Sequence, residues 1–164
     1  MNSLELFALL KKQAESILIT DEVRPATDSL PIEYELGSSE YASECMRRYN
    51  YEAYLEITNP ETIVVLSNVD NEVIVEFESI LDAYMEAYAP NRSNLKNYIK
   101  LVSLYLAFVA RRPLHPPLIM APERHKGAIK KSGQYCIVGN ADLDGRFPIC
   151  QYCVAYLESN PMKK

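Results

Sequence analysis

The feature that most constrains this fold is one segment, from about residue 94 to Arg111, that is apolar on nearly every side of a helix. Its apolar residues are Leu95, Tyr98, Ile99, Leu101, Val102, Leu104, Tyr105, Leu106, Phe108 and Val109. A helix with apolar residues all round must be buried. The continuous apolar run from residue 101 to 110 is too short for a membrane span, which needs about 18 residues or more. The segment therefore predicts a buried central helix in a soluble, mainly α protein, and no membrane partner.

Other helices are expected to pack around this central one. Residues 3–19 carry apolar residues three and four apart, with Ser3 as a candidate N-cap. A second helix is expected from Ser38 or Ser39 to about residue 57. A third is expected from a cap at Asp70 to about residue 89, where Pro90 stops it. The predicted fold is a helical bundle.

The sequence between the second and third of these helices leaves two possibilities open. Asn59-Pro60 is a favourable helix start, because it combines an N-cap residue with proline at the first helical position. The run at residues 63–66, Ile-Val-Val-Leu, is rich in β-branched residues and equally suits a short strand. Periodicity does not decide between helix and strand here.

The character of the chain changes after Pro113, because regular apolar spacing gives way to frequent prolines and glycines. Long irregular segments are uncommon in compact domains and usually have a function. We therefore expect one domain over residues 1–164. Residues 1–112 would form its helical core, and residues 113–164 an irregular tail packed on that core and clamped by cysteines.

The clamp is predicted from three of the four cysteines, because Cys136, Cys150 and Cys153 all lie in this tail. Cys150 and Cys153 form a C-x-x-C pair, a spacing that lets two thiolates bind one ion from a tight turn. Zinc accepts thiolate and imidazole ligands in tetrahedral geometry, and its binding supplies folding energy to loop-rich segments. Candidates for a fourth ligand are His115, His125, Cys45, an acidic oxygen or water.

Other interpretations of these cysteines remain open. An iron–sulfur cluster would need Cys45 as a fourth thiolate, since such clusters are usually held by four. Free cysteines can also simply be buried, and Cys45 on an apolar helix face fits that description. A thioredoxin-like redox site is nearly excluded, because only 11 residues follow Cys153 and the βαβ fold continues well beyond its C-x-x-C.

Charge and composition narrow the possible partners and the compartment. The net charge is −5, which disfavours non-specific binding to nucleic acid. Basic residues between Arg111 and Lys131 are interpreted as a solvated loop. The first residues lack the basic and apolar regions of a secretory signal. Four cysteines without such a signal indicate thiols or metal ligands in the cytoplasm.

The C-terminal half resembles an uncharacterised archaeal family known from methanogens, domain-of-unknown-function family 2115. The resemblance covers about residues 95–158. It rests on an apolar helix, the basic pair Arg111-Arg112 and the Pro-x-His-Pro sequence at residues 113–116. Tyr135-Cys136 and the closing Cys150-x-x-Cys153 complete the pattern. The resemblance implies an archaeal cytoplasm and a retained Cys/His set, and it assigns no activity.

This resemblance favours His115 over His125 as the fourth ligand, since it includes His115. The prolines around His115 also restrict where its imidazole points. Our first hypothesis is therefore a non-catalytic, zinc-containing structural or interaction protein, with an unidentified protein as partner. The second is a redox or catalytic protein with an iron–sulfur cluster or an open zinc position. The third is a metal-free helical adaptor.

Overall fold

The computed structural model describes residues 1–26, 39–116 and 149–154, without the side chains of Ser39 and Cys150. Four α-helices occur in this part of the chain: α1 (Ser3–Ala14), α2 (Ser39–Thr58), α3 (Asn71–Tyr88) and α4 (Ser93–Leu104). A short π-helix, η1 (Tyr105–Val109), continues α4, and η2 (Ile149–Tyr152) is one turn of 3-10 helix. The predicted mainly helical fold is confirmed.

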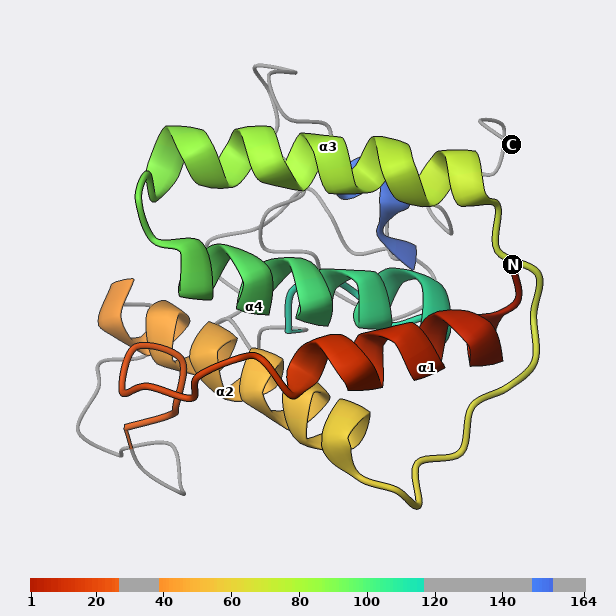
Figure 1. The fold of residues 1–164 in the computed structure, drawn as a ribbon. Coiled ribbons are helices and arrows are strands. Elements are labelled where there is room, and N and C mark those ends of the chain that lie inside the picture. Colours follow the sequence, from red (N-terminus) through yellow and green to blue (C-terminus); the bar gives the residue numbers. More distant parts are fainter. Residues whose placement is uncertain (27–38, 117–148, 155–164) are drawn as a thin grey trace, which may run out of the picture.

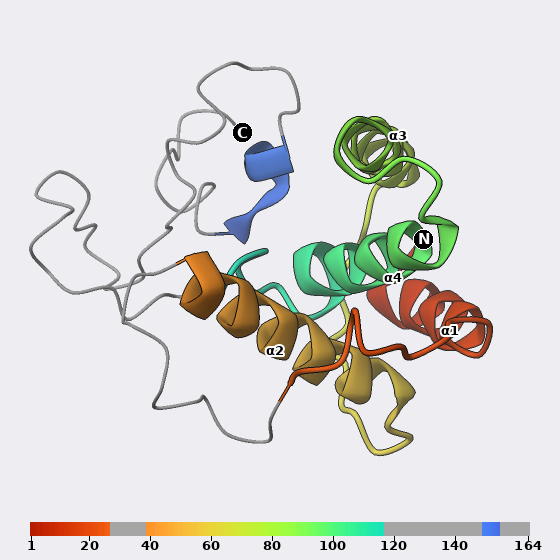
Figure 2. The ribbon, with the colours of Figure 1, turned by 90° about the vertical axis from the view of Figure 1, so that its left-hand side faces the viewer.

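The central helix is also confirmed. The continuous element formed by α4 and η1 contacts α1, α2 and α3. Seen end-on, α4 lies between α3 on one side and α1 and α2 on the other (Figure 2). Its fully buried side chains include Tyr98, Leu101, Val102, Leu104 and Leu106. No helix in the described part of the chain is long and apolar enough to cross a membrane.

The N-cap of helix α1 lies one residue earlier than the cap expected from the sequence. Asn2, not Ser3, is the N-cap, and a capping box forms because Glu5 N–H donates to the Asn2 side chain while Glu5 Oε2 accepts from Asn2 N–H. Ser3 is instead fully buried and binds the chain between α2 and α3. The helix ends earlier than expected, at Ala14, and the chain beyond it is held by the Asn94 side chain, which binds both backbone groups of Leu18.

The structure forms neither of the two possibilities left open between α2 and α3, a helix beginning at Asn59-Pro60 or a short strand at residues 63–66. Asn59 N–H donates to Leu55 O and so completes the end of α2. The Asn59 side chain then accepts from Glu61 N–H, the hydrogen bond of an Asx turn. Residues 63–66 follow as extended chain, neither a helix nor a named strand, and run along one end of the bundle (Figure 1). An isolated antiparallel bridge joins Asn2 and Asn68.

The predicted cysteine-clamped tail falls mostly outside the described residues. Cys136, His125 and the side chain of Cys150 lie outside the described residues. What is described is η2, which contacts α3 and carries a buried Tyr152. The Tyr152 ring lies 4.7 Å from the Phe77 ring and 6.4 Å from the Phe108 ring, between centroids. This aromatic contact attaches η2 to the helical core.

Candidate functional site

The candidate site begins where the central helix ends. In η1 the Ala110 N–H donates to Tyr105 O, five residues back, and Arg112 N–H donates to Leu106 O. Between them Arg111 adopts the left-handed conformation, with φ of 49°. A left-handed residue after the last turn is a common way to end a helix, although glycine usually occupies it. Single π-helical turns occur frequently at functional sites.

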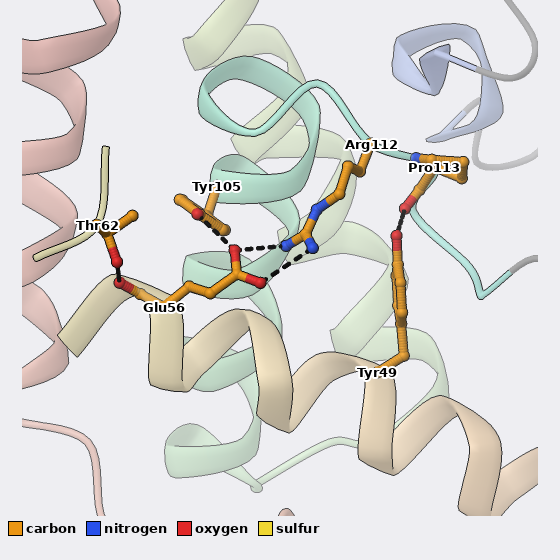
Figure 3. Close-up of polar contacts among 6 residues, drawn as sticks. All are labelled: Tyr49, Glu56, Thr62, Tyr105, Arg112 and Pro113. Atoms are coloured by element: carbon orange, nitrogen blue, oxygen red, sulfur yellow. Dashed lines mark hydrogen bonds and ion pairs between the residues drawn. The ribbon is translucent and has the colours of Figure 1, made fainter. Parts of the chain in front are cut away.

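Arg112, directly after this turn, binds a carboxylate on α2. Its Nη1 and Nη2 donate to Glu56 Oε1 and Oε2 at 3.0 and 2.8 Å, which makes a bidentate ion pair (Figure 3). Tyr105 Oη donates to the same carboxylate at 2.7 Å. The guanidinium also lies 5.9 Å from the Tyr105 ring centre and 6.0 Å from that of Tyr49. We call Glu56, Tyr49, Tyr105 and Arg112 the Arg112 clasp.

The clasp contains two tyrosines whose hydroxyls stay protonated at neutral pH. Burial raises the pKa of Tyr49 to about 12, while the positive charge of Arg112 opposes the rise and Cys153 adds to it. Burial, helped by the hydrogen bond to Glu56, also raises the pKa of Tyr105. Both hydroxyls therefore act as hydrogen-bond donors. Tyr49 Oη donates to Pro113 O at 2.7 Å, as Figure 3 shows.

The clasp and this bond hold the chain that leads to His115 against α2. The next backbone amide, Leu114 N–H, donates to Cys153 Sγ at 3.4 Å. Both residues are buried, and Cys153 is only 2% exposed. The contact brings together two segments that are 39 residues apart in sequence. The Cys153 sulfur thus lies against the amide of the residue that directly precedes His115.

His115 is half-buried, and burial lowers its pKa below 6.5. Its imidazole is therefore neutral near pH 7, the form in which histidine binds a metal ion. Of the four predicted metal ligands, the structure places Cys153 and His115 in one region. Cys136 and the Cys150 side chain are outside the described residues, as is His125. Within residues 1–26, 39–116 and 149–154, no three His, Cys, Asp or Glu side chains form a group that could hold a metal.

Cys45, the alternative ligand, has a different setting. It is buried on α2 and shares a hydrogen bond with Tyr41. The first turn of α2 lies well apart from η2 in Figure 1. This placement fits a core cysteine.

The Arg112 clasp is not predicted from the sequence. The sequence predicts Arg112 in a solvated basic loop, whereas Arg112 binds Glu56 on α2. One signal was available, because Tyr49 and Glu56 are seven residues apart and so lie on one face of α2. Periodicity cannot say which distant cation meets that face.

The sequence profile of a family described as an uncharacterized protein conserved in archaea, DUF2115, matches residues 2–157. The chain belongs to this family. The resemblance expected over residues 95–158 is thus confirmed, and the match extends through the N-terminal half as well.

Relatives from three methanogens are similar over nearly their whole length. A UPF0305 protein of Methanocaldococcus jannaschii is 28% identical over 161 residues, which cover 94% of this chain and 95% of that protein. UPF0305 proteins of Methanothermobacter thermautotrophicus and Methanococcus maripaludis are 24% and 26% identical, and in each case 94% of this chain and 96% of the relative are covered. No solved structure matches the chain. None of these names states an activity, a cofactor or a partner.

Proposed function

We propose that this protein is a non-catalytic structural or interaction protein of the methanogen cytoplasm, whose tail is held on the helical core by one zinc ion. The proposed ligands are Cys136, Cys150, Cys153 and His115. Three thiolates and one imidazole form a tetrahedral zinc set with no position left for a substrate. The role of the ion would be to stabilise residues 113–164 in one conformation.

The observation that supports this proposal is the hydrogen bond from Leu114 N–H to the buried Cys153 sulfur, next to His115. Metal ligands are characteristically oriented by hydrogen bonds from groups around them, and backbone amides donate to ligating sulfurs. The Arg112 clasp would belong to this surrounding shell. It fixes Pro113 and therefore the amide of Leu114, so a fixed donor faces the sulfur.

The proposed set of three thiolates and one imidazole can be compared with the alternative, an iron–sulfur cluster held by four thiolates. Cys150 and Cys153 are three residues apart in the sequence, a spacing that lets two thiolates bind one ion from a tight turn. A neutral imidazole suits zinc, whereas an iron–sulfur cluster usually takes a fourth thiolate. Cys45 would have to supply that thiolate, and it lies among the core residues of α2. The local geometry therefore favours zinc over an iron–sulfur cluster.

The test is metal analysis of the full chain purified without added metal and without oxygen. We expect about one zinc per chain in the wild-type protein and in Cys45→Ser, which serves as the matched control. Cys153→Ser and His115→Ala should each retain much less zinc, and protease should cleave their residues 113–164 faster. Full zinc content in Cys153→Ser, or iron with sulfide in the wild type, would overturn the proposal.

A further inference from the structure

One peptide group, the one that joins Pro113 to Leu114, is bound at both of its polar ends. Tyr49 Oη, on α2, donates to its carbonyl oxygen, Pro113 O, at 2.7 Å (Figure 3). Its N–H, which belongs to Leu114, donates to Cys153 Sγ at 3.4 Å. A trans peptide group is planar, and its C=O and N–H point in opposite directions. The tyrosine hydroxyl and the sulfur therefore hold the same rigid group from two sides.

The orientation of this peptide group depends on few other contacts. The proline ring fixes φ of Pro113, so the group can turn mainly about the bond from Cα to the carbonyl carbon of Pro113. The residue before it is tied to the end of the central helix, because Arg112 N–H donates to Leu106 O at 2.9 Å. The hydrogen bond at the carbonyl therefore selects the direction in which the Leu114 N–H points.

Tyr49 is well suited to hold this carbonyl. Its side chain is half-buried on α2, and its ring centre lies 6.0 Å from the guanidinium of Arg112. Burial raises the pKa of Tyr49 to about 12, so the hydroxyl keeps its proton at neutral pH. Cys153 adds to this rise, as expected for a sulfur close to the hydroxyl. The phenol is therefore a permanent hydrogen-bond donor in the region of Cys153.

The two hydrogen bonds also strengthen each other. A donor at the carbonyl oxygen draws electrons from the peptide nitrogen, which makes the N–H a better donor, and linked hydrogen bonds polarise one another in this way inside proteins. Cys153 is only 2% exposed, so little water competes for its sulfur. Loss of the Tyr49 hydroxyl would therefore weaken the bond to the sulfur in strength as well as in direction.

We propose that Tyr49 is the positioning residue for Cys153 as a metal ligand, because its hydroxyl acts through the peptide group of Pro113 and Leu114 to keep an amide donor on the sulfur. The inference rests on the zinc site proposed above and gives a role to a residue outside the ligand set. Loss of a group that orients a metal ligand typically lowers metal affinity by about 10- to 100-fold. Tyr49 acts through one intervening group, so we expect about tenfold.

Tyr49→Phe tests this role, because it removes the hydroxyl and keeps the ring beside Arg112. The zinc affinity of the full chain is measured by competition with a chromophoric chelator, after circular dichroism has shown the helical content of the wild type. The zinc dissociation constant should rise about tenfold. The matched control is Tyr54→Phe, which removes a hydroxyl from the same helix, where the ring lies against those of Tyr51 and Tyr98. This control should bind zinc like the wild type.

Two spectroscopic readouts separate positioning of the sulfur from a general loss of stability. With cobalt(II) in place of zinc, the sulfur-to-metal charge-transfer absorption of Tyr49→Phe should shift to longer wavelength, because a sulfur that loses hydrogen bonding gives up electrons more easily. The second readout needs no variant. In the wild type loaded with NMR-active cadmium, the Leu114 amide proton should show scalar coupling to the metal through its bond to Cys153.

The outcomes distinguish this inference from the zinc proposal itself. If the wild type binds zinc and Tyr49→Phe keeps both the affinity and the cobalt spectrum, Tyr49 has no positioning role and the zinc site stands. An equal loss of affinity in Tyr54→Phe, or a cadmium-loaded wild type without coupling to the Leu114 amide, would overturn the inference in the same way. A wild type that binds no zinc would overturn the proposed function and this inference with it.

Discussion

Replacing Arg112 by lysine should destabilise the protein, although the charge is retained. Lysine is a point charge, so it can make only one of the two parallel bonds to Glu56. It also loses the planar guanidinium that lies near the rings of Tyr49 and Tyr105. The change therefore tests whether the geometry of the clasp, beyond its charge, stabilises the chain leading to His115.

The expected loss follows from the exposure of the pair. Arg112 and Glu56 side chains are 37% and 39% exposed, so their ion pair is partly screened and is worth about 1 kcal/mol. Two cation–π contacts at a partly exposed site add about 0.5 kcal/mol each. The buried Arg112 Nε has no hydrogen-bond partner among the described residues, and its removal offsets part of this loss. We expect the free energy of unfolding to fall by about 1–2 kcal/mol.

The assay is urea unfolding followed by far-ultraviolet circular dichroism. Arg47→Lys is the matched control, because Arg47 makes a single 3.2 Å bond to Glu44 that lysine can replace. It should change stability by no more than about 0.5 kcal/mol. In a double-mutant cycle, Glu56→Gln should cost less in the Arg112→Lys background than in the wild type. Equal stability of Arg112→Lys and wild type, or additive losses, would refute the reasoning.

Two further predictions concern the central helix. Arg111→Gly should raise the free energy of unfolding by about 1 kcal/mol, because glycine adopts the left-handed conformation at φ 49° without steric cost, and a loss of stability in chemical denaturation would contradict this. Tyr98→Phe should unfold at the same or a slightly higher urea concentration, because the buried Tyr98 hydroxyl has no partner in the described part of the chain. Burial raises the pKa of Tyr98 above its usual value of 10.0. Above pH 10 the unfolded chain loses the Tyr98 proton more readily than the folded one, so the free energy of unfolding of the wild type falls as pH rises further. The variant should therefore lose less stability than wild type above pH 10, and identical pH profiles would exclude this role.

Much of the helical frame could be predicted from local patterns. The all-round apolar segment was expected to be central, and α4 with η1 contacts the other three long helices. Asp70 was expected to cap α3, and its side chain accepts from Glu72 N–H. These features depend on residues a few positions apart, which is the range over which sequence periodicity carries information.

The errors arose where a distant residue decides the local structure. Ser3 was a reasonable cap by type, but its hydroxyl binds Val65 and Ser67, more than 60 residues away. The chain after the end of α1 is held by Asn94, which is 76 residues from Leu18 in sequence. Arg112 was placed in solvent because nothing nearby in sequence marks Glu56 as its partner. Among the proposed ligands, His115 is placed beside Cys153 by the family resemblance and its flanking prolines, since no local spacing links two residues so far apart in the sequence.

The most direct test of the zinc proposal is X-ray absorption at the zinc edge of the intact, anaerobically purified protein. We expect three sulfur ligands at about 2.3 Å and one nitrogen ligand at about 2.0–2.1 Å, with no bound water. Replacing His115 by alanine should remove the nitrogen contribution or the metal itself. A sample without zinc, or zinc bound mainly by oxygen, would contradict the account.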